Sequence, residues 1–166
     1  MPEKKTLERA RKDKREGKSA STQAGEFVHE EMDHIREGKH GARSTKQAIA
    51  IGLSKARRAG VDLPPPTNAS AETRRKAAHD SDVGHDGAAH KTSATRSRAT
   101  KKALKREGHS AASKSALSKQ ATSAAKKRTA TDRSAAAKKA AQTKGAAGRS
   151  AAARKAAHTR EVHAHH

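Results

Sequence analysis

The chain of 166 residues contains no cysteine, no tryptophan and no tyrosine, and it has a single phenylalanine. Without cysteine there is no disulfide framework, no thiolate nucleophile and no cysteine-based zinc site. No apolar run approaches the roughly 18 residues that span a bilayer, and the charged N-terminal segment lacks the apolar stretch of a secretory signal. We therefore expect a cytoplasmic protein without a membrane partner.

Large apolar side chains are scarce throughout the sequence. Alanine accounts for 37 of the 52 hydrophobic residues, and Leu, Ile, Val and Phe together number only 13. The share of the chain made up by Leu, Ile, Val and Phe is far below roughly 20%, the level under which a highly charged chain is expected to be disordered. We therefore expect a mostly α-helical chain that cannot build one large core and is largely disordered when free.

Positive charge is what the sequence has in abundance, with 38 Lys and Arg against 17 Asp and Glu and a net charge of +21. Residues 101–166 alone hold 17 basic and 3 acidic residues, whereas residues 21–66 are nearly neutral and hold nine of the 15 larger apolar residues. These shifts predict a basic N-terminal helix (1–20), a helical hairpin (21–63), a Pro/Gly/Ser linker (64–100) that starts at three consecutive prolines, and an Ala/Lys-rich basic tail (101–166).

Apolar spacing in the central segment predicts helices at 23–37 and 45–59. Val28, Met32 and Ile35 share one face of the first helix, and each helix is followed by a glycine that can end it.

Ser44 and Gln47 form a capping box at the start of the second helix. Burying the nine apolar side chains of this segment does not offset the entropy of ordering it. The hairpin therefore needs a second copy, a docked flanking helix or a partner to be stable.

The tail is repetitive. The segment from Arg133 to Thr143 recurs 16 residues later as Arg149 to Thr159, with nine of eleven positions identical. Neither copy has an apolar face, so we expect marginal or disordered helices that bury nothing and act as interchangeable binding elements. Phosphates would quench the repulsion between the bases and order the segment.

The candidate nucleic-acid-binding residues are therefore the clustered bases of the tail. A solubilising tail without a partner is the alternative, but the charge exceeds what solubility needs. The sequence has no aromatic side chains to stack on bases in this segment, no zinc finger and no basic zipper, so we expect no base-specific recognition. The candidates are Lys101, Lys102, Lys105, Arg106, Lys126, Lys127, Arg128, Lys138, Lys139, Arg154 and Lys155.

Catalytic and metal motifs are absent from the sequence. His29-Glu30 with His34 does not fit His-Glu-x-x-His, because the second histidine comes five residues after the first instead of four. The histidines near the C-terminus, His163, His165 and His166, have no carboxylate or cysteine to complete a site. No P-loop, Gly-x-Gly-x-x-Gly or Gly-x-Ser-x-Gly motif occurs, so we expect no metal, no cofactor and no enzymatic activity.

Two further groups of charged residues lie in the central segment. The acidic residues of the first helix are expected to form an exposed face that repels DNA or docks a basic partner. At the end of the second helix, Lys55, Arg57 and Arg58 either contact phosphate or only complement the helix dipole. The acidic residues are Glu26, Glu30, Glu31, Asp33 and Glu37.

The central segment resembles a short uncharacterised bacterial domain. The resemblance rests on Lys46-Gln47-Ala48-Ile49-Ala50-Ile51, Leu53-Ser54, Ala56-Arg57 and Ala59-Gly60, preceded by a Glu-rich helix and the turn Lys39-His40-Gly41. The chain departs from that pattern at Lys55, where many members have Glu, and in a shortened loop before the second helix. The resemblance implies a domain boundary and a bacterial origin, and it implies no activity.

The tail is similar in composition to the C-terminal domain of linker histones and to their bacterial Ala/Lys-rich counterparts, although Lys-Pro-Lys motifs are absent. This resemblance implies DNA neutralisation and condensation without sequence reading. The sequence thus favours a histone-like, nucleoid-associated protein that binds duplex DNA non-specifically. The alternative is an adaptor whose hairpin binds a protein partner or a second copy, with a tail that aids solubility or stress tolerance. RNA or a ribosome is the alternative polyanion.

Overall fold

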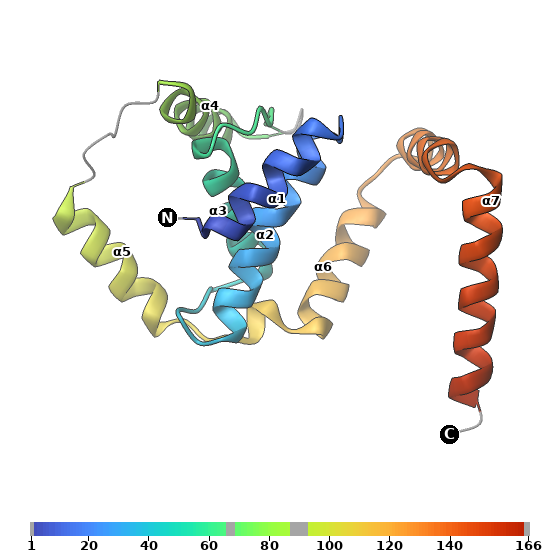
Figure 1. Ribbon diagram of the computed structural model, residues 1–166. Coiled ribbons are helices and arrows are strands. Elements are labelled where there is room, and N and C mark those ends of the chain that lie inside the picture. The colour runs from blue at the N-terminus through green and yellow to red at the C-terminus, as the bar shows by residue number, and fades with distance from the viewer. Residues whose placement is uncertain (1, 66–68, 87–92, 165–166) are drawn as a thin grey trace. The chain divides into compact units, whose positions relative to one another are not determined.

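The computed structural model describes residues 2–65, 69–86 and 93–164 (Figure 1). In these ranges the chain is mostly helical and has no strand. The chain forms two compact units, Met1–Gln120 and Ala121–His166. The elements are α1 (Lys4–Arg15), α2 (Ala20–Arg36), α3 (Thr45–Arg58), α4 (Ala71–His85), α5 (Ala94–Arg106), the short 3₁₀ helix η1 (Ser110–Ala112), α6 (Lys114–Lys126) and α7 (Ala130–Ala164).

The expectation of a largely disordered chain with marginal helices in the tail is wrong. Helices occupy much of the segment expected to be a linker, as α4 and α5, and most of the basic tail, as α6 and α7. Alanine, lysine and arginine are among the best helix formers, and serines at residues 70 and 93 cap α4 and α5. Of the three prolines at the start of this segment, Pro66 lies outside the described residues.

Local signals at the ends of α2 and α3 act largely as expected. The hydroxyl oxygen of Ser44 accepts a 3.2 Å hydrogen bond from the amide of Gln47. The Gln47 side chain reaches back one residue further than a capping box requires, because its oxygen accepts from the amide of Arg43 at 2.8 Å. Both helices end at glycines with positive φ, Gly38 and Gly60.

The first apolar cluster joins α1 to α2 and α3. Phe27 is fully buried, together with Ala24 and Ala56, and Leu7 and Ala10 of α1 pack against them. Figure 1 shows α1 lying along α2. The N-terminal helix thus supplies the flanking helix that the hairpin needs, with a single large apolar side chain.

The second apolar cluster recruits the tail. Met32 and Ile35 of α2 are buried together with Ala111 and Ala112, which are 6% and 0% exposed, and Leu117 of α6 packs against the same cluster. The expectation that the tail buries nothing is therefore wrong at its beginning. Small side chains suffice because alanine lets the backbone of η1 approach the hairpin closely.

Four hydrogen bonds fix the segment from Leu104 to Ala112 on the turn between α2 and α3. The amides of Gly41 and Ala42 donate to the carbonyl oxygens of Leu104 and Gly108 at 2.9 and 3.1 Å. The hydroxyl of Thr45 donates to Ala111 O at 2.7 Å and Nε of Arg36 donates to Ala112 O at 3.0 Å. A Cβ at Gly41 would lie 1.9 Å from the carbonyl oxygen of Glu107, so this docking requires glycine.

The helix α4 packs against α3 through polar and small residues. The buried carboxylate of Asp80 accepts hydrogen bonds from Ser54 Oγ and Arg58 Nε, both at 2.7 Å. Gly84 brings α4 so close to α3 that a Cβ there would lie 2.1 Å from Arg57 O. The first compact unit therefore includes α4 and η1, and the expected boundaries after residues 20, 63 and 100 fall inside it.

Candidate nucleic-acid interface

All eleven predicted nucleic-acid-binding residues are exposed. The structure divides them between the two compact units. Four lie on α5 in the first compact unit, and the other seven lie at the end of α6, in the turn that follows it, and on α7.

Four of the six basic residues of α5 form one face of the helix. Arg98, Lys101, Lys102 and Lys105 follow the i, i+3, i+4, i+7 spacing that places side chains on one side of an α-helix. The helix contains no acidic residue and no buried residue. Its backbone is nevertheless anchored, because Leu104 O and Gly108 O, at and just beyond its C-terminal end, accept hydrogen bonds from the turn after α2.

The two copies of the tail repeat occupy two separate helical segments of α7. Gly145 has φ 64° and ψ 175°, which interrupts the helix between the copies. Taken with the residue that directly follows it, each eleven-residue copy has basic residues at its first, sixth, seventh and twelfth positions. These are Arg133, Lys138, Lys139 and Lys144 in the first copy, and Arg149, Arg154, Lys155 and Arg160 in the second.

The same local hydrogen bond recurs in both copies. Thr143 and Thr159 each donate from the hydroxyl to the carbonyl oxygen four residues earlier, at 2.9 Å. At 100° per residue, the four bases of a copy point in three directions around the helix. No side of either segment is therefore without positive charge.

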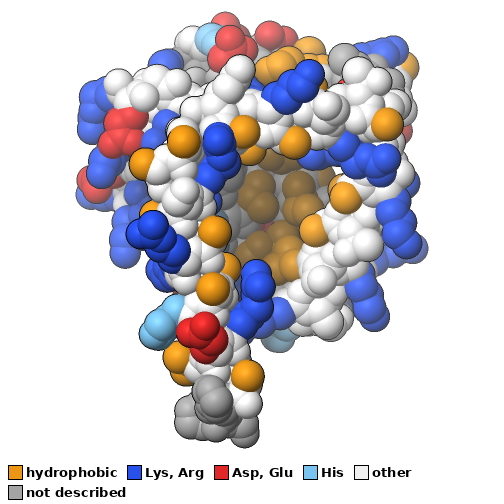
Figure 2. Space-filling model, turned by 90° about the vertical axis from the view of Figure 1, so that its right-hand side faces the viewer, with side chains coloured by type: hydrophobic (Ala, Val, Ile, Leu, Met, Phe, Trp, Pro, Cys, Tyr) orange, Lys and Arg blue, Asp and Glu red, His pale blue; other side chains and the backbone are white. Residues whose placement is uncertain are grey.

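The charge of these helices is not neutralised within the described structure. Between residues 93 and 164 the chain has 19 Lys and Arg and only three acidic residues. Every ion pair in the described ranges uses a base at residue 76 or earlier. Figure 2 shows Lys and Arg side chains spread over the face in view, with Asp and Glu at only a few places.

The three bases at the end of α3 have other partners. Lys55 Nζ donates to Glu31 Oε2 at 2.6 Å. Arg57 is 7% exposed and donates to Leu63 O, and Arg58 pairs with Asp80. These internal contacts belong to neither of the two interpretations of the cluster, phosphate contact or complementation of the helix dipole.

The expectation of a fully exposed acidic face on α2 is wrong for two of its five residues. Glu30 and Glu31 are buried, at 6% and 0% exposure. They are buried because both α1 and α3 pack against α2. The sequence pattern predicted a hairpin, in which only the second helix packs against the first. Glu26, Asp33 and Glu37 remain at least partly exposed.

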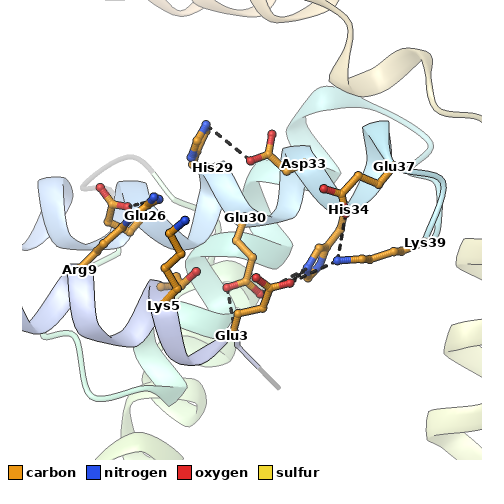
Figure 3. A pocket seen from close by; sticks show the side chains of 11 residues that line it. Glu3, Lys5, Arg9, Glu26, His29, Glu30, Asp33, His34, Glu37 and Lys39 are labelled. Atoms are coloured by element: carbon orange, nitrogen blue, oxygen red, sulfur yellow. Dashed lines mark hydrogen bonds and ion pairs between the residues drawn. The ribbon is translucent and has the colours of Figure 1, made fainter.

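A polar pocket of about 160 Å³ lies between α1 and α2 (Figure 3). Glu3 links two other residues of its lining, because its carboxylate oxygen Oε1 accepts hydrogen bonds from His34 Nε2 at 3.0 Å and from Lys39 Nζ at 3.2 Å. These two hydrogen bonds, that from His34 above all, lower the pKa of Glu3. Both acidic and basic side chains line the pocket.

Sequence reasoning missed one cluster, made of Glu31, His34, His40 and Lys55. The first two share a face of α2 at i, i+3 spacing, but His40 comes from the turn after α2 and Lys55 from α3. Glu31 occupies a position of α2 that the neighbouring helices enclose. The sequence could reveal this cluster only to a reader who already knew how α2 packs.

Comparison with known families agrees with the expected uncharacterised domain. Residues 14–67 match DUF6496, a family of unknown function. The match covers about a third of the chain and includes α2 and α3. No curated protein and no solved structure shows a significant match. The resemblance of the tail to linker histones has no counterpart among these findings.

Within the described residues, the structure contains no helix with the length and apolar character needed to cross a bilayer.

Proposed function

We propose that the protein binds duplex DNA without sequence preference through the exposed bases of α5 and of the helices after residue 120. The observation that carries the proposal is the set of 19 Lys and Arg between residues 93 and 164, none of them in an ion pair within the described structure. Unpaired bases can each neutralise a phosphate and release condensed counterions, which supplies most of the free energy of non-specific binding.

Helical structure favours duplex DNA over duplex RNA as the partner. An α-helix with its side chains is about 10–12 Å wide, which fits the major groove of B-form DNA at about 12 Å. The major groove of A-form RNA is deep and too narrow for a helix. Bases on several sides of each α7 segment can reach the phosphates on both walls of a groove.

The same arrangement supports binding without base recognition. In each α7 segment the residues between the Lys and Arg side chains are mostly alanine. The methyl group of alanine makes no hydrogen bond to the edge of a nucleobase. The helices of 121–166 are exposed along almost their whole length, so nothing holds one face toward the DNA. On these grounds we propose a nucleoid-associated protein that neutralises DNA. Its helix α5 would bind DNA while its C-terminal end stays anchored to the turn after α2.

Fluorescence anisotropy with labelled random duplex DNA tests the proposal in the full-length chain. We expect binding at about 0.15 M salt and a linear fall of log K against log salt, with a slope of about −0.9 per phosphate contact. The double variant Lys138→Glu/Lys139→Glu should weaken binding and flatten that slope.

The matched control is Arg74→Glu/Arg75→Glu, which changes the same charge at an adjacent exposed pair on α4. This control should retain a clearly larger share of the affinity. Equal losses in the two variants would mean that only net charge matters. Absence of binding to DNA at low salt would leave the tail a solubilising segment and would refute the proposal.

A further inference from the structure

Glu31 carries a buried oxygen that the described protein atoms do not satisfy. Its side chain is fully buried, and Oε2 accepts a 2.6 Å hydrogen bond from Lys55 Nζ. Its second oxygen, Oε1, is buried and has no hydrogen-bond partner. An ionised carboxylate is costly to bury unless its oxygens are paired, so a cationic group is expected at Oε1.

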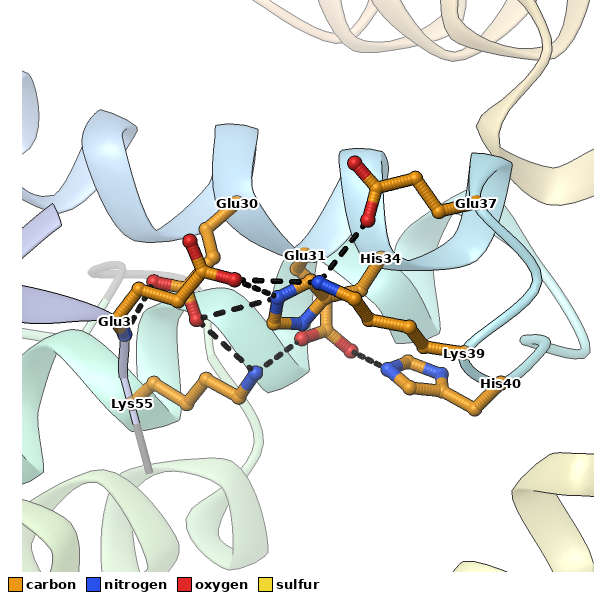
Figure 4. Close-up of polar contacts among 8 residues, drawn as sticks. All are labelled: Glu3, Glu30, Glu31, His34, Glu37, Lys39, His40 and Lys55. Atoms are coloured by element: carbon orange, nitrogen blue, oxygen red, sulfur yellow. Dashed lines mark hydrogen bonds and ion pairs between the residues drawn. The ribbon is translucent and has the colours of Figure 1, made fainter. Parts of the chain in front are cut away.

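The group that faces this oxygen is the ring of His40 (Figure 4). His40 Nδ1 lies 3.0 Å from Gly41 O, and because a carbonyl oxygen only accepts, Nδ1 must carry the proton. In the neutral ring Nε2 then has a lone pair, and it lies 3.3 Å from Glu31 Oε1. Two lone pairs that face each other in a buried position repel, unless a cation lies between them.

His34 brings a third ligand to the same place. Its Nε2 donates to the carboxylate of Glu3 at 3.0 Å, which leaves the lone pair of the neutral ring on Nδ1. Glu31, His34 and His40 each offer one ligand atom, and these atoms all lie within 4.8 Å of one another. The two rings meet edge to face, with centroids 6.3 Å apart.

We propose that Glu31, His34 and His40 bind a divalent transition metal ion of the Zn²⁺ class. Imidazole nitrogen and carboxylate oxygen are the ligands that Zn²⁺ takes at about 2.0–2.2 Å. Two such ligands in tetrahedral geometry are about 3.3–3.5 Å apart, which agrees with the 3.3 Å between Glu31 Oε1 and His40 Nε2. His34 would supply the third ligand and a water molecule the fourth.

The residues around the proposed ligands fit this role. Glu3 orients His34 and the carbonyl of Gly41 orients His40, as carboxylates and carbonyls orient metal-binding histidines in general. Charge balance points the same way, because the buried carboxylates Glu30 and Glu31 share one ammonium group, that of Lys55. A divalent cation compensates the excess negative charge.

Bound metal would hold the turn after α2 in the shape that receives the tail. His40 immediately precedes Gly41 and Ala42, whose amides bind the segment from Leu104 to Gly108. A link from His40 to Glu31 and His34 fixes this turn to α2 at one end. Metal binding should therefore stabilise the docking of α5 and η1 as well as the turn itself.

Isothermal titration of the metal-free full-length chain with Zn²⁺ tests the proposal. Every sample carries His163→Gln, His165→Gln and His166→Gln, so that the histidines near the C-terminus do not contribute. We expect one strong site and a rise of several degrees in Tm on addition of Zn²⁺. His40→Gln and Glu31→Gln should each weaken the site at least about tenfold.

His29→Gln is the matched control, because His29 lies exposed on the same helix and is not a proposed ligand. Its affinity for Zn²⁺ should equal that of the parent chain. Co²⁺ in the parent chain gives a second readout that does not depend on the folding of a variant. Its d–d absorption should show an ordered nitrogen/oxygen site and disappear on addition of Zn²⁺.

Failure of Zn²⁺ to bind, or binding that His29→Gln and His40→Gln weaken equally, would overturn the proposal. A protonated His40 would then satisfy Glu31 Oε1. These results do not bear on DNA binding, since none of the three proposed ligands is among the bases assigned to DNA.

Discussion

Thr45 Oγ1 donates a buried 2.7 Å hydrogen bond to the carbonyl oxygen of Ala111, a residue 66 positions later in the chain. This contact joins the first turn of α3 to the segment that follows the basic helix α5. It makes the beginning of the tail part of the folded unit. The charges of α5 are consequently presented from a helix that is anchored at its C-terminal end.

Replacement of Thr45 by Val should destabilise the first compact unit by about 1–3 kcal/mol. Valine has a similar shape but leaves the carbonyl oxygen of Ala111 buried without a donor. Urea unfolding followed by circular dichroism measures the loss. Hydrogen exchange at the amide of Ala112 should increase with it, and an unchanged exchange rate would contradict the docking described above.

Replacement of Gly41 by Ala should release the segment from Leu104 to Ala112. The added Cβ would lie 1.9 Å from Glu107 O, a distance that only movement of the backbone relieves. We expect a loss of more than about 2 kcal/mol in the free energy of unfolding and greater proteolytic cleavage near residue 108.

The control for this variant is Gly25→Ala. Gly25 is exposed on α2 and a Cβ there meets no atom within 4 Å. Alanine is the better helix former, so this change should raise the free energy of unfolding by about 0.5–1 kcal/mol. If the two substitutions change the free energy of unfolding in opposite directions, the close approach of the Glu107 backbone, and not helix propensity, is the reason that residue 41 is glycine.

Replacement of Lys55 by Met should destabilise the metal-free protein by about 3–5 kcal/mol, because it leaves the buried carboxylate of Glu31 without its ammonium partner. The double variant Glu31→Gln/Lys55→Met should lose less than the sum of the single changes. Lys46→Met is the control, since Lys46 is exposed on the same helix, and its effect should stay within about 0.5 kcal/mol. Additive effects at Glu31 and Lys55 would argue against a coupled pair.

Acid should remove the contribution of Glu3 to stability. Hydrogen bonds from His34 and Lys39 lower its pKa from the ordinary value of 4.5. A lowered folded-state pKa means that this contribution is complete above about pH 4.5 and is lost as the pH falls through the folded-state value. The stability difference between the parent chain and Glu3→Gln, measured with chelator present, should therefore shrink below pH 4.5. In a His34→Gln background that pH dependence should weaken, because the main cause of the lowered pKa is absent.

Deletion of residues 145–160 removes one copy of the repeat with its four bases. Because the two copies form separate helical segments, the first should keep its structure and its contacts with DNA. The slope of log K against log salt should fall in magnitude by up to about 3.6, since each lost phosphate contact contributes about 0.9. Complete loss of binding would show that the copies do not act independently.

Local sequence determined the helices and their ends, because propensity, capping and apolar spacing act within a few residues. Ser44 with Gln47 marks the start of α3, and Gly38 and Gly60 follow the helix ends that they were expected to close. The exposure of the eleven tail bases also follows from sequence alone, since no neighbouring residue type offers them a core.

Only the tertiary structure decided which charged residues are buried and which part of the tail is folded. Glu31 is enclosed because α1 and α3 cover α2 from two sides, and His40 reaches it from a turn. Ala111 and Ala112 join the core because Gly41 lets the backbone of Glu107 approach. Such contacts depend on distances between segments far apart in the chain, and an alanine or a glutamate carries no local mark of the surface that will cover it.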